Sequence, residues 1–183
     1  MKYEKVGRRR PRTEIIIAVA ATIISVCAMA TTVYQTYILR QQQHAAVWPR
    51  LQLSHGYWIQ PDTAHYNLFL QNNGVGPAII QKVYMIHNED SSFSSTAEIA
   101  RAIARQRNLP DTLVYSDYGD VVEDMVIPQQ TQQGLLTLED RRYVAPWVEE
   151  VREGGVQIVI QYQSLYGETW EVAYPGSHHR KIN

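Results

Sequence analysis

The chain has 183 residues, of which 45% are hydrophobic and 19% are charged, a globular composition with room for one ordinary domain and short appendages. Six of the 17 basic residues but only two of the 18 acidic residues lie among the first 14 positions, so the remainder is net acidic although the whole chain has a net charge of −1. The globular composition argues against disorder. The acidic balance of the remainder argues against nucleic-acid binding, since phosphate backbones are neutralised by clustered Lys and Arg.

Residues 15–39 form an uncharged, mostly apolar run of 25 residues. About 20 residues of helix cross the hydrocarbon core of a bilayer, so the run predicts a transmembrane helix embedded in lipid. The bases concentrate before the run, and the positive-inside rule then predicts a cytoplasmic tail at residues 1–14 and a C-terminal domain outside. In a bacterium the helix would lie in the inner membrane, with the domain in the periplasm or at the cell exterior.

A signal-peptide interpretation competes with this anchor. Ala28-Met29-Ala30 resembles the small-residue site at which signal peptides are cleaved. Apolar residues nevertheless continue through Val33, Ile38 and Leu39, which is further than the apolar core of a signal peptide needs. We therefore favour an uncleaved anchor, and cleavage remains the alternative.

Small residues recur every three or four positions along the predicted span. On a helix this spacing places them on one face, where a second helix could approach closely. The simpler explanation is that Ala is common in membrane helices. The face comprises Ala18, Ala21, Thr22, Ser25, Ala28 and Thr32.

Beyond a predicted polar stalk at residues 40–50, the segment 51–175 shows the alternation of apolar and polar residues that half-buried strands produce. The single cysteine, Cys27, lies inside the span, so this outer domain has no disulfide. Residues 176–183 are predicted to be a polar C-terminal tail. Strands are predicted near residues 51–59, 66–70, 78–87, 113–118, 121–127, 135–139, 156–162 and 170–174.

Two segments favour helix. Residues 96–108 follow Ser95, which stands three residues before Glu98 in the spacing of a capping box. Residues 145–153 have Pro146 near their start and two glycines after their end. Short strands without a βαβ rhythm indicate a mainly-β antiparallel sandwich with one or two short helices.

The sequence "NNGVGPAII" at residues 72–80 resembles a ligand-binding loop because of its two glycines. A phosphate loop requires a following helix or a G-K-[ST] sequence, and here a strand pattern follows instead. We therefore predict a structural turn, in which Asn73 and Gly74 adopt positive φ, Gly76 belongs to the bend, and Pro77 opens the next strand.

The same residues carry a resemblance. "NNGVGPAII" is similar to an N-x-G-x-G-P-A-x-I pattern of uncharacterised bacterial single-pass membrane proteins with an immunoglobulin-like outer domain. "YQSLYGETW" at residues 162–170 resembles the C-terminal hairpin of that class, and "WPR" at residues 48–50 its entry into the first strand. The resemblance covers residues 48–174 and implies an immunoglobulin-like sandwich, but it assigns no catalytic residue.

The titratable residues form no recognisable site. None of the six histidines, including His178 and His179 in the predicted tail, has the spacing of a metal-ligand pair. The acidic run Asp117, Asp120, Glu123 and Asp124 lacks the alternation and the final Glu of a calcium loop. We predict no metal and no cofactor.

The sequence thus favours a membrane-anchored interaction module, an accessory subunit that binds an envelope protein or a second copy of itself, over an enzyme. Arg101 and Arg105, on the outward face of the predicted helix 96–108, are the candidate partner contacts. The alternative is an extracytoplasmic enzyme whose site assembles from scattered residues such as His55, Asp62 and His87.

Overall fold

The computed structural model describes residues 11–110, 119–176 and 178–182 and separates the chain into two units, Met1–Ala45 and Ala46–Asn183. In the first unit, one helix, α1 (Pro11–Ala46), is long and apolar enough to cross a membrane. Membrane anchors and signal sequences share these properties, and α1 is compatible with both. The helix includes residues 40–46 of the predicted stalk.

Hydroxyl groups on the predicted pairing face of α1 are bonded within the helix itself. Each donates to a carbonyl oxygen four residues earlier at 2.9 Å: Thr22 to Ala18, Ser25 to Ala21, and Thr32 to Ala28. These donors therefore need no partner helix in an apolar environment, and the expectation of helix pairing rests on the small size of the side chains.

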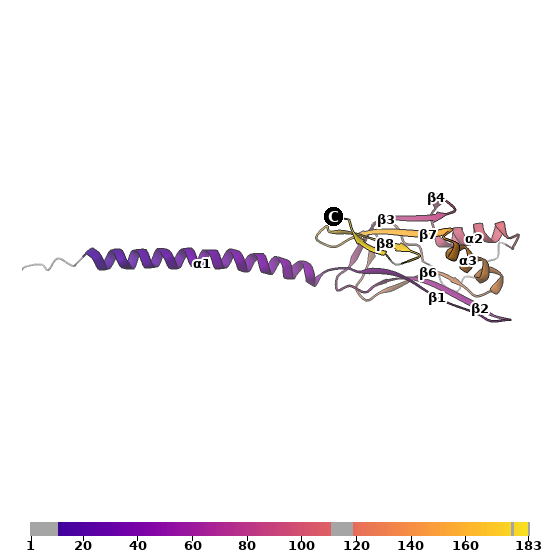
Figure 1. Cartoon of the computed structure of the whole chain (residues 1–183), viewed down its shortest axis with the longest axis horizontal. Helices are drawn as coiled ribbons and strands as arrows, with labels where there is room; N and C mark the ends of the chain where they lie inside the picture. The colour runs from indigo at the N-terminus through magenta and orange to yellow at the C-terminus, as the bar shows by residue number, and fades with distance from the viewer. Residues whose placement is uncertain (1–10, 111–118, 177, 183) are drawn as a thin grey trace, which may run out of the picture. The chain divides into compact units, whose positions relative to one another are not determined.

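The second unit contains two antiparallel β-sheets (Figure 1). The first sheet has the order β1 (Leu51–Ile59), β2 (Ala64–Asn72), β6 (Gln132–Leu138). The second has the order β4 (Asp90–Phe93), β3 (Ala78–His87), β7 (Val156–Gln163), β8 (Thr169–Tyr174), β9 (His178–Lys181), and the short β5 (Val126–Ile127) also pairs with β3. The predicted mainly-β antiparallel architecture is confirmed.

The core lies between the sheets because their strands alternate in burial. In β2 the buried residues include Tyr66, Leu68 and Leu70, and in β7 they include Ile158 and Ile160, each with less than 2% of its surface exposed. Both sets belong to one apolar cluster. Each such side chain contributes about 1.5–3 kcal/mol by leaving water, so this alternation is the main source of stability.

Helix α2 (Thr96–Gln106) confirms the prediction for residues 96–108. Ser95 is its N-cap, with Oγ accepting from Glu98 N at 3.2 Å. Ile99 and Ile103 are buried, so α2 packs its apolar face on the domain and against α3 (Arg141–Glu153) at one end of the sheets (Figure 1).

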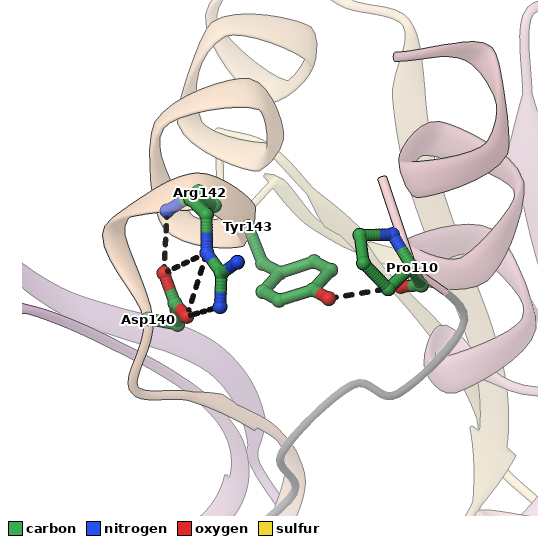
Figure 2. A network of polar contacts seen from close by, with 4 residues as sticks. All are labelled: Pro110, Asp140, Arg142 and Tyr143. Atoms are coloured by element: carbon green, nitrogen blue, oxygen red, sulfur yellow. Dashed lines mark hydrogen bonds and ion pairs between the residues drawn. The ribbon is translucent and has the colours of Figure 1, made fainter. Parts of the chain in front are cut away.

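Helix α3 begins four residues before the predicted start. We placed the start near Pro146, but the N-cap is Asp140, whose Oδ1 accepts from Arg142 N at 2.8 Å. Figure 2 shows that the Asp140 carboxylate also binds the Arg142 guanidinium, with Nη2 to Oδ2 at 2.6 Å. In the same view Tyr143 Oη donates to the carbonyl of Pro110 at 2.8 Å, which ties the first turn of α3 to the segment after α2.

Two further expectations are corrected. Residues 121–125 are not strand, because Asp124 adopts φ 63° in a turn whose backbone bonds to Ile80, leaving only β5 from the predicted strand 121–127. Within the predicted tail 176–183, residues 178–181 form β9, which pairs with β8. The strand predicted at residues 113–118 lies outside the described residues.

Candidate functional site

The turn at residues 73–77 packs against the segment through which the chain enters the domain. Its centre is Asn72, which is fully buried. Asn72 Nδ2 donates to the carbonyls of Gly76 and Ile127 at 2.9 and 3.0 Å, and Oδ1 accepts from the backbone N–H of Gly74 and Arg50 at 3.0 and 3.2 Å. The side chain thus uses all its donors and two acceptor positions on the protein, which is a structural role.

The predicted reason for the glycines was wrong. Neither Asn73 nor Gly74 has a positive φ. The glycines are instead required by a close backbone approach, because a Cβ on Gly74 would lie 2.7 Å from the carbonyl carbon of Pro49, and one on Gly76 would lie 2.6 Å from Val47 Cα. Pro77 directly precedes β3, as expected.

The predicted contact residues Arg101 and Arg105 lie on the outward side of α2, Arg101 half-buried and Arg105 exposed. With Phe93, Glu98 and Ala102 they line a surface hollow. The Glu98 carboxylate accepts from Ser94 N at 2.8 Å and Ser94 Oγ at 2.9 Å, and these bonds hold its pKa below the usual value. The surface therefore carries a fixed negative charge beside its bases and is not a purely basic face.

A different surface, the β1 edge, has the properties of an interaction site. β1 stands at the end of the first sheet and pairs only with β2, so one side of its backbone lacks a strand neighbour among the described residues. Its nine residues contain no Asp, Glu, Lys, Arg or Pro. Tyr57, Trp58 and Ile59 are 45%, 48% and 40% exposed.

The outer edge of the second sheet is protected differently. β9 reads HHRK, and its Arg180 and Lys181 pair with Glu171 and Glu168 at 3.0 and 3.1 Å. Charged residues on an edge strand discourage the addition of a further strand, whereas a long uncharged edge permits it. Of these two edges, β1 is the one suited to pairing with another chain.

Beside the β1 edge lies an aromatic pocket of about 340 Å³, lined by residues of β1, β2, α3 and the β8–β9 connection. His55 is stacked between Tyr57 and Tyr66, with centroid distances of 6.0 and 5.9 Å, and lies edge-on to Tyr174 at 5.4 Å. The full lining is His55, Tyr57, Tyr66, Val148, Val151, Arg152 and Pro175.

Two tyrosine hydroxyls next to the pocket are hydrogen-bonded to each other. Tyr66 Oη and Tyr174 Oη share a hydrogen bond of 2.8 Å. Burial raises the pKa of both phenols, so neither provides a phenolate nucleophile near neutral pH. The cation of the lining is Arg152, which forms no ion pair with any carboxylate that the structure describes. The pocket therefore combines apolar and aromatic surface with one positive charge that has no ion pair with a described carboxylate.

Aromatic side chains also cover the other face of the β1–β2 hairpin. Trp58 stacks on His65 with 5.9 Å between centroids and 19° between ring planes. Trp58 and Tyr57 are consecutive in β1 and so project to opposite faces of the strand. The outer part of β1 thus presents large side chains on both faces, which a partner could contact at the same time as the backbone edge.

The residues of the enzyme alternative do not share a contact. His55 contacts aromatic residues of the pocket, Asp62 lies in the β1–β2 connection, and His87 at the end of β3 lies 3.5 Å from Glu150 and 3.1 Å from Asn88. Of the acidic run, Asp117 lies outside the described residues. Within the described part of the chain, no three His, Cys, Asp or Glu side chains form a group that could hold a metal ion.

One sequence feature indicates the exposed part of β1. Tyr57, Trp58 and Ile59 are three consecutive large apolar residues, whereas a strand with one buried face needs only every second residue to be apolar. Nothing in the sequence links Arg152, much later in the chain, to this strand, because only the packing of α3 brings it there.

Comparison with known proteins adds no assignment. A scan against protein-family models found no matching family, and a search of curated proteins found no significant match.

Proposed function

We propose that this protein is a membrane-anchored interaction module, an accessory subunit that uses the outer part of β1 to bind a protein of the bacterial envelope. In this proposal α1 is an uncleaved anchor in the inner membrane with its N-terminus in the cytoplasm. The basic residues before α1 and the uncharged run from Ile15 to Leu39 support this orientation.

The proposal includes an immunoglobulin-like fold for the outer domain. The strand orders β1-β2-β6 and β4-β3-β7-β8 support it. They correspond to the A-B-E and C′-C-F-G arrangements of immunoglobulin-type sandwiches. β9 is an addition to that pattern, and α2 and α3 occupy two of the connections between strands.

The observation that carries the proposal is the uncharged edge of β1 with its exposed Tyr57, Trp58 and Ile59. A soluble domain that exposed such an edge without a partner would be prone to associate non-specifically. Aromatic residues are also enriched at the energetic centres of protein interfaces, since they bury large areas with few rotatable bonds.

The test is affinity purification of the full chain from membranes with chemical crosslinking and mass spectrometry. The Tyr57→Ser/Trp58→Ser double variant should lose the co-purified protein. The Arg101→Glu/Arg105→Glu double variant should retain it, since α2 carries the second candidate surface. Loss of the co-purified protein only in the arginine variant would move the site to α2.

Orientation is tested separately. Protease added to intact spheroplasts should degrade residues 46–183, and carbonate extraction should leave the full-length chain in the membrane. A mature chain that starts near Thr31 would instead establish that the helix is a cleaved signal peptide.

A further inference from the structure

Building on the proposed function, we propose that the β1 edge and the aromatic pocket together bind an extended acidic peptide segment of the partner protein. The segment adds to the first sheet as a strand beside β1, inserts an apolar side chain into the pocket, and places a carboxylate on Arg152.

The outer part of the β1 backbone, residues 55–59, suits strand addition, whereas at the start of the strand Leu51 N already donates to Tyr162 Oη. β1 pairs with β2 in continuous register from Leu51 to Ile59 without a bulge. In an antiparallel pair, alternate residues of an edge strand direct their N–H and C=O groups away from the sheet. Residues 55–59 are all exposed, so a peptide could reach these groups. Main-chain hydrogen bonds of this kind supply affinity in strand-addition complexes, and pockets for alternate side chains supply selectivity.

The pocket suits one apolar side chain. Its volume of about 340 Å³ accommodates a leucine- to phenylalanine-sized group, and Val148, Val151 and Pro175 provide apolar walls beside the His55 and Tyr57 rings. Residues i and i+2 of a strand project to the same face, about 6.6 Å apart. A peptide residue two positions from the inserted one therefore faces the same side, the side of α3.

Charge selects an acidic peptide. Arg107 pairs with Glu149 at 2.7 Å and Arg180 with Glu171 at 3.0 Å, whereas Arg152, like Arg50 and Arg141, has no ion pair with a described carboxylate. Of these three arginines, Arg152 is the one that lines the pocket. The β1 strand of a second copy would pair with this edge but carries no carboxylate, so it would leave Arg152 without a partner. A segment of another protein with an aspartate or a glutamate can form main-chain hydrogen bonds to β1 and an ion pair with Arg152 at the same time.

The test uses the full chain in lipid nanodiscs and an array of fluorescent octapeptides built from threonine and valine. The fourth peptide position carries leucine, phenylalanine or threonine, and the sixth carries aspartate, asparagine or lysine. We expect the peptides with an apolar fourth residue and a sixth-position aspartate to bind at least tenfold more tightly than their asparagine and lysine counterparts. Moving the aspartate to the fifth position, on the opposite face of the strand, should remove this preference.

Two changes test the mechanism. Arg152→Gln should abolish the preference for the sixth-position aspartate, while Arg152→Lys should restore part of it. Methylation of successive peptide amide nitrogens should weaken binding at every second position only, because alternate N–H groups face β1. The inference is overturned if the aspartate and asparagine peptides bind with equal affinity. It is also overturned if methylation weakens binding equally at successive positions, or if no peptide binds above the level of empty nanodiscs.

The outcomes separate this inference from the function on which it rests. If the Tyr57→Ser/Trp58→Ser variant loses a co-purified protein while the array shows no acidic preference, the module stands and the acidic-peptide inference is wrong. If the Tyr57→Ser/Trp58→Ser variant keeps both the co-purified protein and the binding of the peptides, the proposed function and the acidic-peptide inference are both wrong. If Trp58→Cys, introduced together with Cys27→Ser, forms a disulfide between two copies in membranes, the edge is occupied by a second copy and the inference is overturned.

Discussion

The side-chain amide of Asn72 is bonded to the carbonyl oxygen of Gly76 at 2.9 Å, and this bond closes the turn that joins the two sheets. The same amide reaches the carbonyl of Ile127, so one buried side chain connects the turn to β5. The glycine-rich sequence between β2 and β3 is thus explained by the folding of the domain and provides no ligand site.

Replacing Gly76 by Ala should destabilise the domain. The added Cβ would lie 2.6 Å from Val47 Cα and closer still to the Val47 carbonyl, so the backbone must shift, at a cost of about 1–3 kcal/mol. Urea denaturation of the outer domain within the full chain measures this. Gly134→Ala is the matched control, since no atom of another described residue that packs there lies within 4 Å of its added Cβ and it should change stability by about 0.5 kcal/mol at most. Equal losses of stability for Gly76→Ala and Gly134→Ala would contradict the role of the close approach between Gly76 and Val47.

Asn72 and Asn73 should differ sharply when each is replaced by Ala. Asn72→Ala leaves buried backbone groups without partners, so we expect a loss of about 3 kcal/mol or more. Asn73 is exposed and, among the described residues, its side chain bonds to Gln52 Oε1 alone, at 3.0 Å, so Asn73→Ala should cost about 0.5 kcal/mol or less. Denaturation of the two variants in parallel provides the measurement, and a larger loss for Asn73 would refute the assignment.

Stability should fall in mildly acidic solution because of His179. Its Nε2 lies 2.5 Å from Tyr162 Oη, which also accepts from Leu51 N at 3.1 Å. Burial raises the pKa of Tyr162 to about 12, so the hydroxyl keeps its proton, and it donates to Nε2 when neutral His179 carries its own proton on Nδ1. Burial, and next the charge of Arg50, lower the pKa of His179 below its ordinary value of 6.5.

The lowered pKa of folded His179 determines how stability changes with pH. The unfolded chain binds the proton of His179 more tightly than the folded chain, so stability is complete above pH 6.5 and decreases as the pH falls through the folded pKa. Denaturation between pH 8 and 5.5 should show a steeper decrease for wild type than for His179→Gln. His178→Gln, at an exposed position of the same strand, should retain the wild-type slope. A His179→Gln profile parallel to wild type would contradict the prediction.

The cap of α3 should contribute about 1 kcal/mol, since Asp140→Ala removes the acceptor of Arg142 N. The Arg142 side chain, and next its backbone N–H, hold the pKa of Asp140 below its usual value. The contribution is therefore present above pH 3.8 and lost as the pH falls through the lower, folded pKa. Glu139→Ala is the control, because Glu139 is exposed and does not cap the helix. Comparable losses for the two variants in urea would show that the cap has no special role.

Local patterns predicted much of the fold. The uncharged run at residues 15–39 lies within α1, and Ser95 caps α2 as its spacing with Glu98 indicates. The alternation in residues 156–162 and 170–174 predicted β7 and β8 because each strand buries one face. These features depend on neighbours within a few residues, which a sequence displays directly.

The features that were missed depend on distant contacts. Residues 178–181 are polar, and they form a strand because β8 offers an edge and because His179 reaches Tyr162. Asn72 acts through Arg50 and Ile127, far from it in sequence. The aromatic pocket forms because α3 packs with Val148 and Arg152 beside β1. The residue pattern within β1 or within α3 does not indicate that these two elements are in contact.

Photo-crosslinking in living cells can establish whether the β1 edge is the binding surface. Benzoylphenylalanine placed at Trp58, which is 48% exposed, should capture a specific envelope protein. The same group at Leu165, which is 59% exposed in the β7–β8 connection, should capture little of it. Capture of that protein at Leu165 but not at Trp58, or no specific capture from Trp58, would show that the β1 edge is not the binding surface.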